Sequence, residues 1–76
     1  PALSRLTDRE LEVFRLIGRG LSSKEIAHHL HLSIKTIGTY RERIKEKLHI
    51  KHATELVRCA VHWTQAEEGG GGRLSE

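Results

Sequence analysis

The chain has 76 residues and a formal net charge of +3, which allows one small domain and mildly favours a polyanionic partner. We expect a small core without a large substrate cavity. We also expect no cofactor and no small-molecule substrate. No apolar run is long enough to cross a bilayer and no charged-then-apolar leader is present, so we expect a cytoplasmic protein without a membrane partner. The single cysteine, Cys59, excludes an intramolecular disulfide.

Two capping boxes predict where the first two helices start. Thr7 is followed three residues later by Glu10, and Ser22 is followed by Glu25. In each pair the hydroxyl accepts from an amide of the first turn, and the carboxylate accepts from the amide of the capping residue. Apolar residues then recur at helical spacing. The sequence therefore predicts helices over residues 8–19 and 23–30.

A third helix begins after Ser33 and concentrates the positive charge. Between Ser33 and Lys51, six Lys or Arg residues stand against two acids. At 100° per residue, one side is apolar and faces the core through Ile37, Tyr40, Ile44 and Leu48. The opposite side can meet the base edges and phosphates of DNA; it carries Lys35, Gly38, Thr39, Glu42, Arg43 and Glu46. Because only a short turn separates the second and third helices, they have the outline of a helix-turn-helix.

A fourth helix is predicted over residues 53–66. Its core stripe comprises Ala53, Leu56, Val57, Ala60 and Trp63. A neighbouring face carries Thr54, Arg58, Val61 and Gln65, where Val61 is expected at the surface. Contact with a second copy explains that position, and so does an isolated apolar surface residue. The expected fold is an all-α, four-helix bundle-like domain over residues 1–68, followed by a flexible Gly-rich tail over residues 69–76.

The chain resembles the LuxR-type effector domain in register over Leu3–Trp63. The stretches that carry the resemblance are Leu6–Val13, Gly20–Ala27, Ser33–Tyr40 and Lys47-Leu48. Within this match, Lys35–Arg41 looks like the branch found in two-component response regulators (NarL/FixJ-like). The resemblance implies sequence-specific binding of double-stranded promoter DNA, with the third helix in the major groove and a homodimer formed through the fourth helix. A receiver domain usually precedes the effector in that family, so we expect this chain to be the C-terminal domain downstream of a phosphorylated receiver.

The resemblance also implies roles for individual residues. Base contacts fall on Gly38, Thr39 and Glu42, with Arg43 adding to the readout because Gly38 stands where Lys is often found. The fourth-helix residues Thr54, Arg58, Val61 and Gln65 form the expected dimer interface. The expected contacts to the DNA backbone come from Ser22, Ser23, Lys24, Lys35, Thr36, Tyr40 and Lys47.

Other classes of function have weaker support in the sequence. His28 and His31 could share a metal ion, but no acid or Cys supports them, so we expect no metal site. Cys59 has only His62 as a nearby base and no phosphate-binding glycine loop precedes a helix, so we expect no enzyme and no catalytic residues. The alternative is a helical protein-interaction module, such as a sigma-type region that contacts RNA polymerase; RNA polymerase is also a partner to consider for the DNA-binding domain itself.

Overall fold

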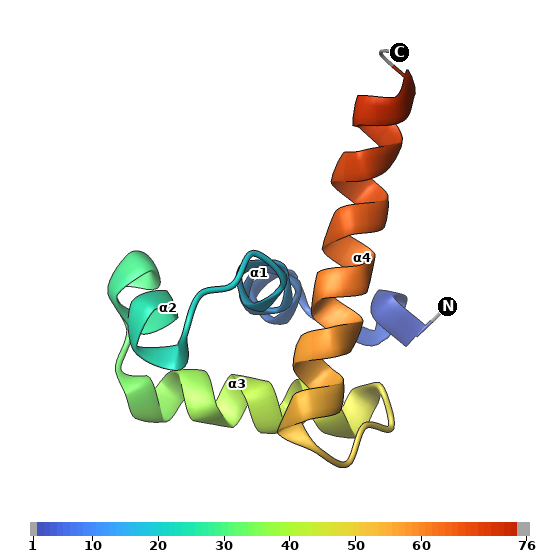
Figure 1. Ribbon diagram of the computed structural model, residues 1–76. Helices are drawn as coiled ribbons and strands as arrows, with labels where there is room; N and C mark the ends of the chain where they lie inside the picture. The colour runs from blue at the N-terminus through green and yellow to red at the C-terminus, as the bar shows by residue number, and fades with distance from the viewer. Residues whose placement is uncertain (1, 75–76) are drawn as a thin grey trace.

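The computed structural model describes the backbone of residues 2–74 and the side chains of residues 3–67. Within that range every element is helical, and the four α-helices confirm the predicted all-α fold. None of the described helices combines the length and hydropathy needed to cross a bilayer. The elements in chain order are η1 (Ala2–Arg5), α1 (Asp8–Gly18), α2 (Ser23–Leu30), α3 (Ile34–Lys47) and α4 (Ala53–Leu74) (Figure 1).

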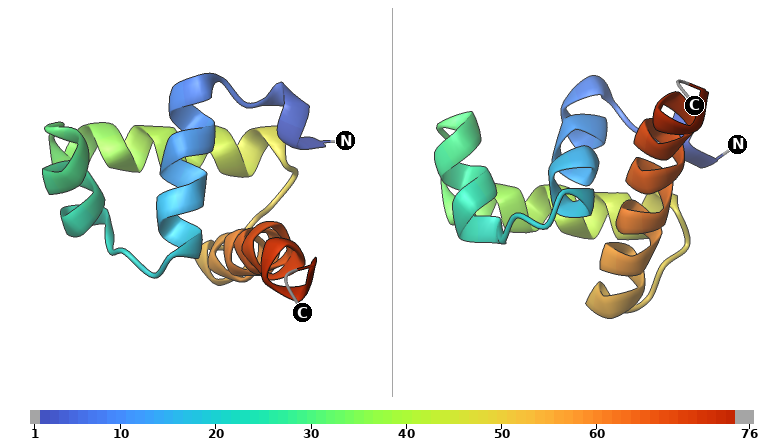
Figure 2. Two further views of the ribbon diagram at one scale, coloured as in Figure 1. Left: turned by 90° about the horizontal axis from the view of Figure 1, so that it is seen from above. Right: turned by 45° about the horizontal axis from the view of Figure 1, so that its top comes forward.

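The first helix is the centre of the arrangement. α1 lies between α2 and α4 and crosses over α3, as the view from above shows (Figure 2). α4 packs chiefly against α1, and its C-terminal half projects away from the other helices (Figure 1). Burial of apolar side chains from all four helices, worth roughly 1.5–3 kcal/mol for each large one, holds this arrangement together. The core consists of Val13, Phe14, Leu16, Ile17, Ile26, Ala27, Ile37, Ile44, Leu56 and Ala60.

The predicted caps are present at the starts of α1, α2 and α3. Thr7 Oγ1 accepts from the amide of Glu10 at 3.1 Å, and the Glu10 carboxylate accepts from the Thr7 amide at 2.9 Å. Ser22 and Glu25 form the same reciprocal pair. Ser33 Oγ accepts from the amide of Thr36 at 3.0 Å. The local sequence signals for the helix starts are therefore confirmed.

The turn between α2 and α3 depends on a histidine in a left-handed conformation. His31, the C-cap of α2, has φ 59° and ψ 43°. A residue with a Cβ is strained there by about 1–2 kcal/mol, whereas glycine is not. This left-handed residue allows the chain to change direction within the three residues that separate α2 from α3.

Replacing His31 with glycine is expected to raise the free energy of unfolding by about 0.5–1 kcal/mol, because relief of strain exceeds the extra entropy of the unfolded chain. Urea unfolding of the variant measures this. His28→Gly is the matched control: His28 is exposed within α2, so glycine there is expected to lower stability by about 0.5–1 kcal/mol. Equal destabilisation by both changes would contradict the strain.

The buried side of α4 differs from the predicted stripe. Leu56 and Ala60 are buried as predicted, and Trp63 packs partly buried against the core. Val57 is 39% exposed and Ala53 is also exposed, so their assignment to the core was wrong. The physical reason is that Thr64, 3% exposed, continues the buried row of Leu56 and Ala60, which turns the helix away from Val57.

The C-terminal end of α4 also differs from the prediction. The helix continues through the four glycines to Leu74 rather than ending near Ala66, so the predicted end was wrong. The backbone hydrogen-bond pattern of a helix needs no side chain, and glycine lowers helix stability by about 1 kcal/mol per residue without forbidding the helix. The predicted flexibility of residues 69–76 stays a prediction, and Ser75 and Glu76 lie outside the described residues.

Candidate nucleic-acid interface

One long side of α3 is left uncovered by the other described elements. α1 and α2 pack on the opposite side (Figures 1 and 2). That packed side buries Ile37 and Ile44 and partly buries Tyr40 and Leu48, as predicted. The uncovered side, which we call the outer face of α3, consists of Lys35, Gly38, Thr39, Glu42, Arg43 and Glu46. All of these residues are exposed except the half-buried Gly38.

The positive charge of α3 is only partly neutralised within the domain. Lys45 pairs with Glu42 at 2.9 Å, and Lys47 pairs with Glu10 at 2.6 Å. The remaining three cations of this helix, Lys35, Arg41 and Arg43, form no ion pair within the described residues. The field near the first three turns of α3 is therefore positive and available to an anionic partner.

The first turn of α3 suits an approaching phosphate. Ser33 Oγ caps the helix and lies 2.9 Å from Thr36 Oγ1. No acid occupies this turn, whereas the first turn of α1 holds Asp8 and Glu10. The partial positive charge of a helix N-terminus favours an anion, and here no carboxylate occupies that place.

The start of α2 brings further predicted backbone contacts beside α3. Ser22 and Lys24 are exposed and Ser23 is half-buried, and the first turn of α2 lies next to α3 (Figures 1 and 2). The starts of α2 and α3 therefore both lie close to the outer face of α3. A protein that reads bases in a groove needs such neighbouring contacts to the phosphates for its positioning.

Residues in the middle of α3 differ in their contacts with the rest of the domain. The Thr39 hydroxyl donates to the Lys35 carbonyl at 3.3 Å, so its oxygen can still accept. The Tyr40 ring packs against the core, as expected for a ring with a polar tip near the surface. A Cβ built on Gly38 would meet no atom within 4 Å, so packing inside the domain does not require glycine there.

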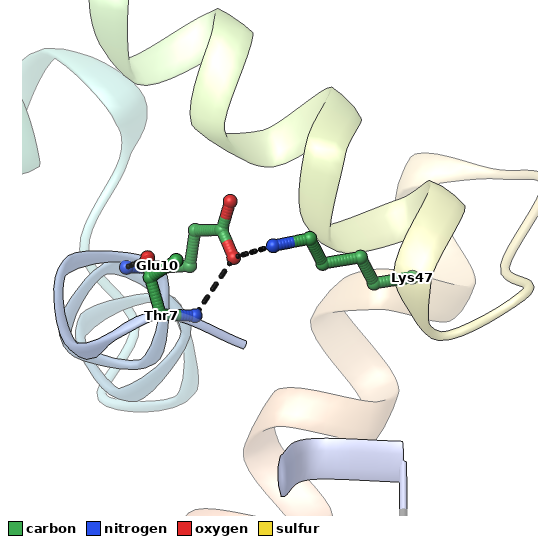
Figure 3. A network of polar contacts seen from close by, with 3 residues as sticks. All are labelled: Thr7, Glu10 and Lys47. Atoms are coloured by element: carbon green, nitrogen blue, oxygen red, sulfur yellow. Dashed lines mark hydrogen bonds and ion pairs between the residues drawn. The ribbon is translucent and has the colours of Figure 1, made fainter. Parts of the chain in front are cut away.

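Lys47 is held by a nearly buried carboxylate (Figure 3). Glu10 is 2% exposed, and its Oε1 accepts from both the Thr7 amide at 2.9 Å and Lys47 Nζ at 2.6 Å. Burial alone would raise the pKa of Glu10, but the hydrogen bonds and the charge of Lys47 outweigh it, so the pKa is below its ordinary value. This pair fastens the C-terminal end of α3 to the N-terminal cap of α1.

The four predicted dimer residues share one side of α4. Their spacing of four, three and four residues aligns them along the helix; Thr54, Arg58 and Gln65 are exposed, and Val61 is half-buried rather than fully at the surface. Exposed Val57 adds apolar surface one turn before Val61. Next to this side, α4 borders an open, mostly apolar hollow of about 810 Å³, which Arg58 also lines, together with Leu3, Phe14, Leu48, Ile50, Glu55, Cys59, His62, Trp63 and Ala66.

The sequence pattern does not predict two features of the structure. The pattern identifies Glu10 only as a cap, because its partner Lys47 lies 37 residues away. The pattern does not predict that Ile34 is 54% exposed, because this residue lies three positions before the buried Ile37 and helical spacing alone does not place it at the surface. Among the described residues, no three His, Cys, Asp or Glu side chains gather to hold a metal ion.

Comparison with known proteins agrees with this geometry. Residues 4–60 match the model of the family described as "Bacterial regulatory proteins, luxR family". The chain is 43% identical over 58 residues to the uncharacterized response regulatory protein YgeK of Escherichia coli (strain K12), covering 76% of this chain and 40% of that protein. It is 43% identical over 56 residues to the oxygen regulatory protein NreC of Staphylococcus carnosus (strain TM300), covering 74% and 26%.

A third relative is BvgA of Bordetella pertussis (strain Tohama I / ATCC BAA-589 / NCTC 13251), whose name refers to transcription regulation of virulence factors. It is 41% identical over 58 residues, covering 76% of this chain and 28% of BvgA. The chain thus spans less than half the length of each of these relatives, and no solved structure matches it significantly. The family match over most of the chain shows that it belongs to the luxR family of bacterial regulatory proteins and contains a DNA-binding helix-turn-helix domain.

Proposed function

We propose that this domain binds double-stranded promoter DNA sequence-specifically by inserting α3 into the major groove. The observation that carries the proposal is the uncovered outer face of α3, on which Lys35 and Arg43 form no ion pair within the described residues. The half-buried Arg41 of the same helix is likewise unpaired there. The major groove admits one α-helix, and the helices on the opposite side of α3 leave this face free to enter it.

Reading and anchoring fall on different residues. Thr39, Glu42 and Arg43 face outward beside Gly38 and supply the base contacts. The Lys47 ammonium has three donors, so it can contact a phosphate while it also donates to Glu10. The other proposed contacts to the DNA backbone come from Ser22, Ser23, Lys24, Lys35, Thr36 and Tyr40.

The domain is proposed to act as a homodimer downstream of a phosphorylated receiver domain in the same regulator. The alignment and exposure of Thr54, Arg58 and Gln65 beside Val61 support a helix-to-helix contact through α4. The name of YgeK supports membership of a response regulator. Two copies related by a twofold axis would place their α3 helices in successive major grooves, with half-sites about 10 base pairs apart.

Selection from a pool of randomised duplexes tests the proposed function. The expected result is enrichment of a palindrome with two half-sites, bound by two copies of the domain in sedimentation measurements. Recovery of no preferred sequence would contradict sequence-specific reading, and one copy per palindrome would contradict the dimer.

Replacing Lys35 with alanine is expected to weaken binding to preferred and scrambled duplexes by about the same factor. It should also reduce the slope of log affinity against log salt by about 0.9 for each bound copy, or about 1.8 for the proposed dimer, because each copy loses one phosphate contact. Equilibrium titrations between about 50 and 200 mM salt measure the slope. Arg9→Ala removes one exposed positive charge from α1 and should leave the slope nearly unchanged; equal slopes for wild type and Lys35→Ala would remove Lys35 from the interface.

A further inference from the structure

The side chain of Ile34 is not part of the hydrophobic core of the domain. Ile34 is the first residue of α3 and is 54% exposed, more than Val57, the other exposed large hydrophobic residue in the described part of the chain. It belongs neither to the core nor to the partly buried residues packed against the core. A β-branched residue at an exposed helix position also adds nothing to helix propensity. Neither packing nor local structure explains an isoleucine here.

The surface beside Ile34 is open. Gly38 lies four residues later, on the same side of α3, and a Cβ there would meet nothing within 4 Å. No side chain therefore projects from position 38 into the space beside Ile34. The pair forms an apolar patch with a free neighbouring surface at the N-terminal end of α3.

This patch is continuous with the proposed DNA-binding surface. Lys35 and Thr36, two of the proposed phosphate anchors, follow Ile34 directly. In helix-turn-helix readers the N-terminal residues of the inserted helix contact base edges. Because Ile34 shares a side of α3 with Gly38, it lies at the edge of the outer face and can reach a base edge in the major groove if α3 enters as proposed.

We propose that Ile34 reads thymine through contact with its C5-methyl group, and that Gly38 leaves the space for that base pair to approach. The thymine methyl is the distinctive apolar group in the major-groove pattern of the four base pairs. An alkyl side chain can neither donate to a base acceptor nor bind a phosphate, so the methyl is the groove feature that it fits. This inference rests on the proposed function and adds a specificity-determining residue to it.

Substitution of deoxyuridine for thymidine tests the contact, because it removes only the methyl group. The probe is the duplex that wild type enriches from the randomised pool, with each thymidine replaced in turn. Wild type is expected to lose about fourfold in affinity at one thymidine per half-site, the factor for burying one methyl group. Ile34→Ala is expected to bind the unmodified duplex several-fold more weakly and to be insensitive to the replacement at that thymidine.

Val57→Ala is the matched control, since it shortens the other exposed apolar residue, which lies on α4. It should keep the wild-type sensitivity to deoxyuridine. Ile34→Ala should unfold at the same or a slightly higher temperature than wild type, because the side chain is exposed and alanine favours a helix.

The outcomes separate the two proposals. If the preferred duplex is bound but wild type tolerates deoxyuridine at every position, or Ile34→Ala keeps the same sensitivity as wild type, the inference about Ile34 is wrong and the proposed function stands. If no duplex is bound even in dilute buffer, the proposed function fails and this inference fails with it.

Discussion

Replacing Gly18 with alanine is expected to lower the free energy of unfolding by about 2–3 kcal/mol. A Cβ on Gly18 would overlap Thr64 Oγ1 and the carbonyl group of Ala60. The Ala60 carbonyl belongs to the backbone of α4 and cannot turn aside, so α1 and α4 must separate. The two helices meet across this contact and bury Leu56 and Phe14 nearby, so the loss reaches the core. Urea unfolding followed by circular dichroism measures the change.

Gly38→Ala is the control for this first prediction, because it makes the same chemical change in another α-helix. A Cβ at Gly38 meets no atom within 4 Å, so alanine is expected to raise stability by about 1 kcal/mol through its helix propensity. Opposite signs for the two variants support the close approach of α1 and α4. A Gly18→Ala variant as stable as wild type would show that the helices do not meet as described.

Replacing Lys47 with methionine is expected to cost about 2 kcal/mol of stability near neutral pH. The change leaves the carboxylate of Glu10, 2% exposed, without its cation. The cost is lower than the about 3–5 kcal/mol for breaking a fully buried pair, because the Lys47 side chain is 34% exposed.

The stability loss caused by Lys47→Met is expected to depend on pH. In wild type the pKa of Glu10 is below its ordinary value, so its contribution is present above about pH 4.3 and is lost as the pH falls through the lowered value. In Lys47→Met the hydrogen bond and the charge of Lys47 no longer lower the pKa of Glu10, so this pKa is higher than in wild type and the carboxylate contributes less stability above it. The stability difference between the two proteins should therefore be largest near neutral pH and shrink on acidification.

Lys45→Met is the matched control for Lys47→Met. Lys45 lies on the same helix and also pairs with a glutamate, but the side chain of Glu42 is 69% exposed, so water replaces the lost cation. The expected cost is below about 1 kcal/mol, with little dependence on pH in the same range. If the two lysines give equal losses at all pH values, the burial of Glu10 does not govern the effect.

The sequence predicted those parts of the fold that depend on neighbours along the chain. The caps at Thr7, Ser22 and Ser33 join residues three apart, so the order of the amino acids alone indicates where three helices start. The apolar spacing of Ile37 and Ile44 also predicted which side of α3 is packed, and hence which side is free.

The remaining features depend on contacts between distant residues. The role of Gly18 is set by Ala60 and Thr64 on another helix, and that of Glu10 by Lys47. The buried stripe on α4 was misassigned because hydrophobicity favoured Val57. In the structure α4 instead turns Ala60 and the hydroxyl-bearing Thr64 toward Gly18, where helix α1 comes close, and Val57 stays exposed. Such packing leaves no periodic signal in one sequence. The individual DNA and dimer contacts of the candidate site stay predictions.

The most direct test of the central claim is a nuclear magnetic resonance titration of the isotope-labelled domain with the duplex recovered by selection. If the outer face of α3 enters the groove, amide signals should shift most at Lys35, Thr39 and Arg43 and at the start of α2, in a salt-dependent manner. Shifts confined to α4 and the hollow beside Trp63, with α3 unchanged, would contradict insertion of α3 into DNA.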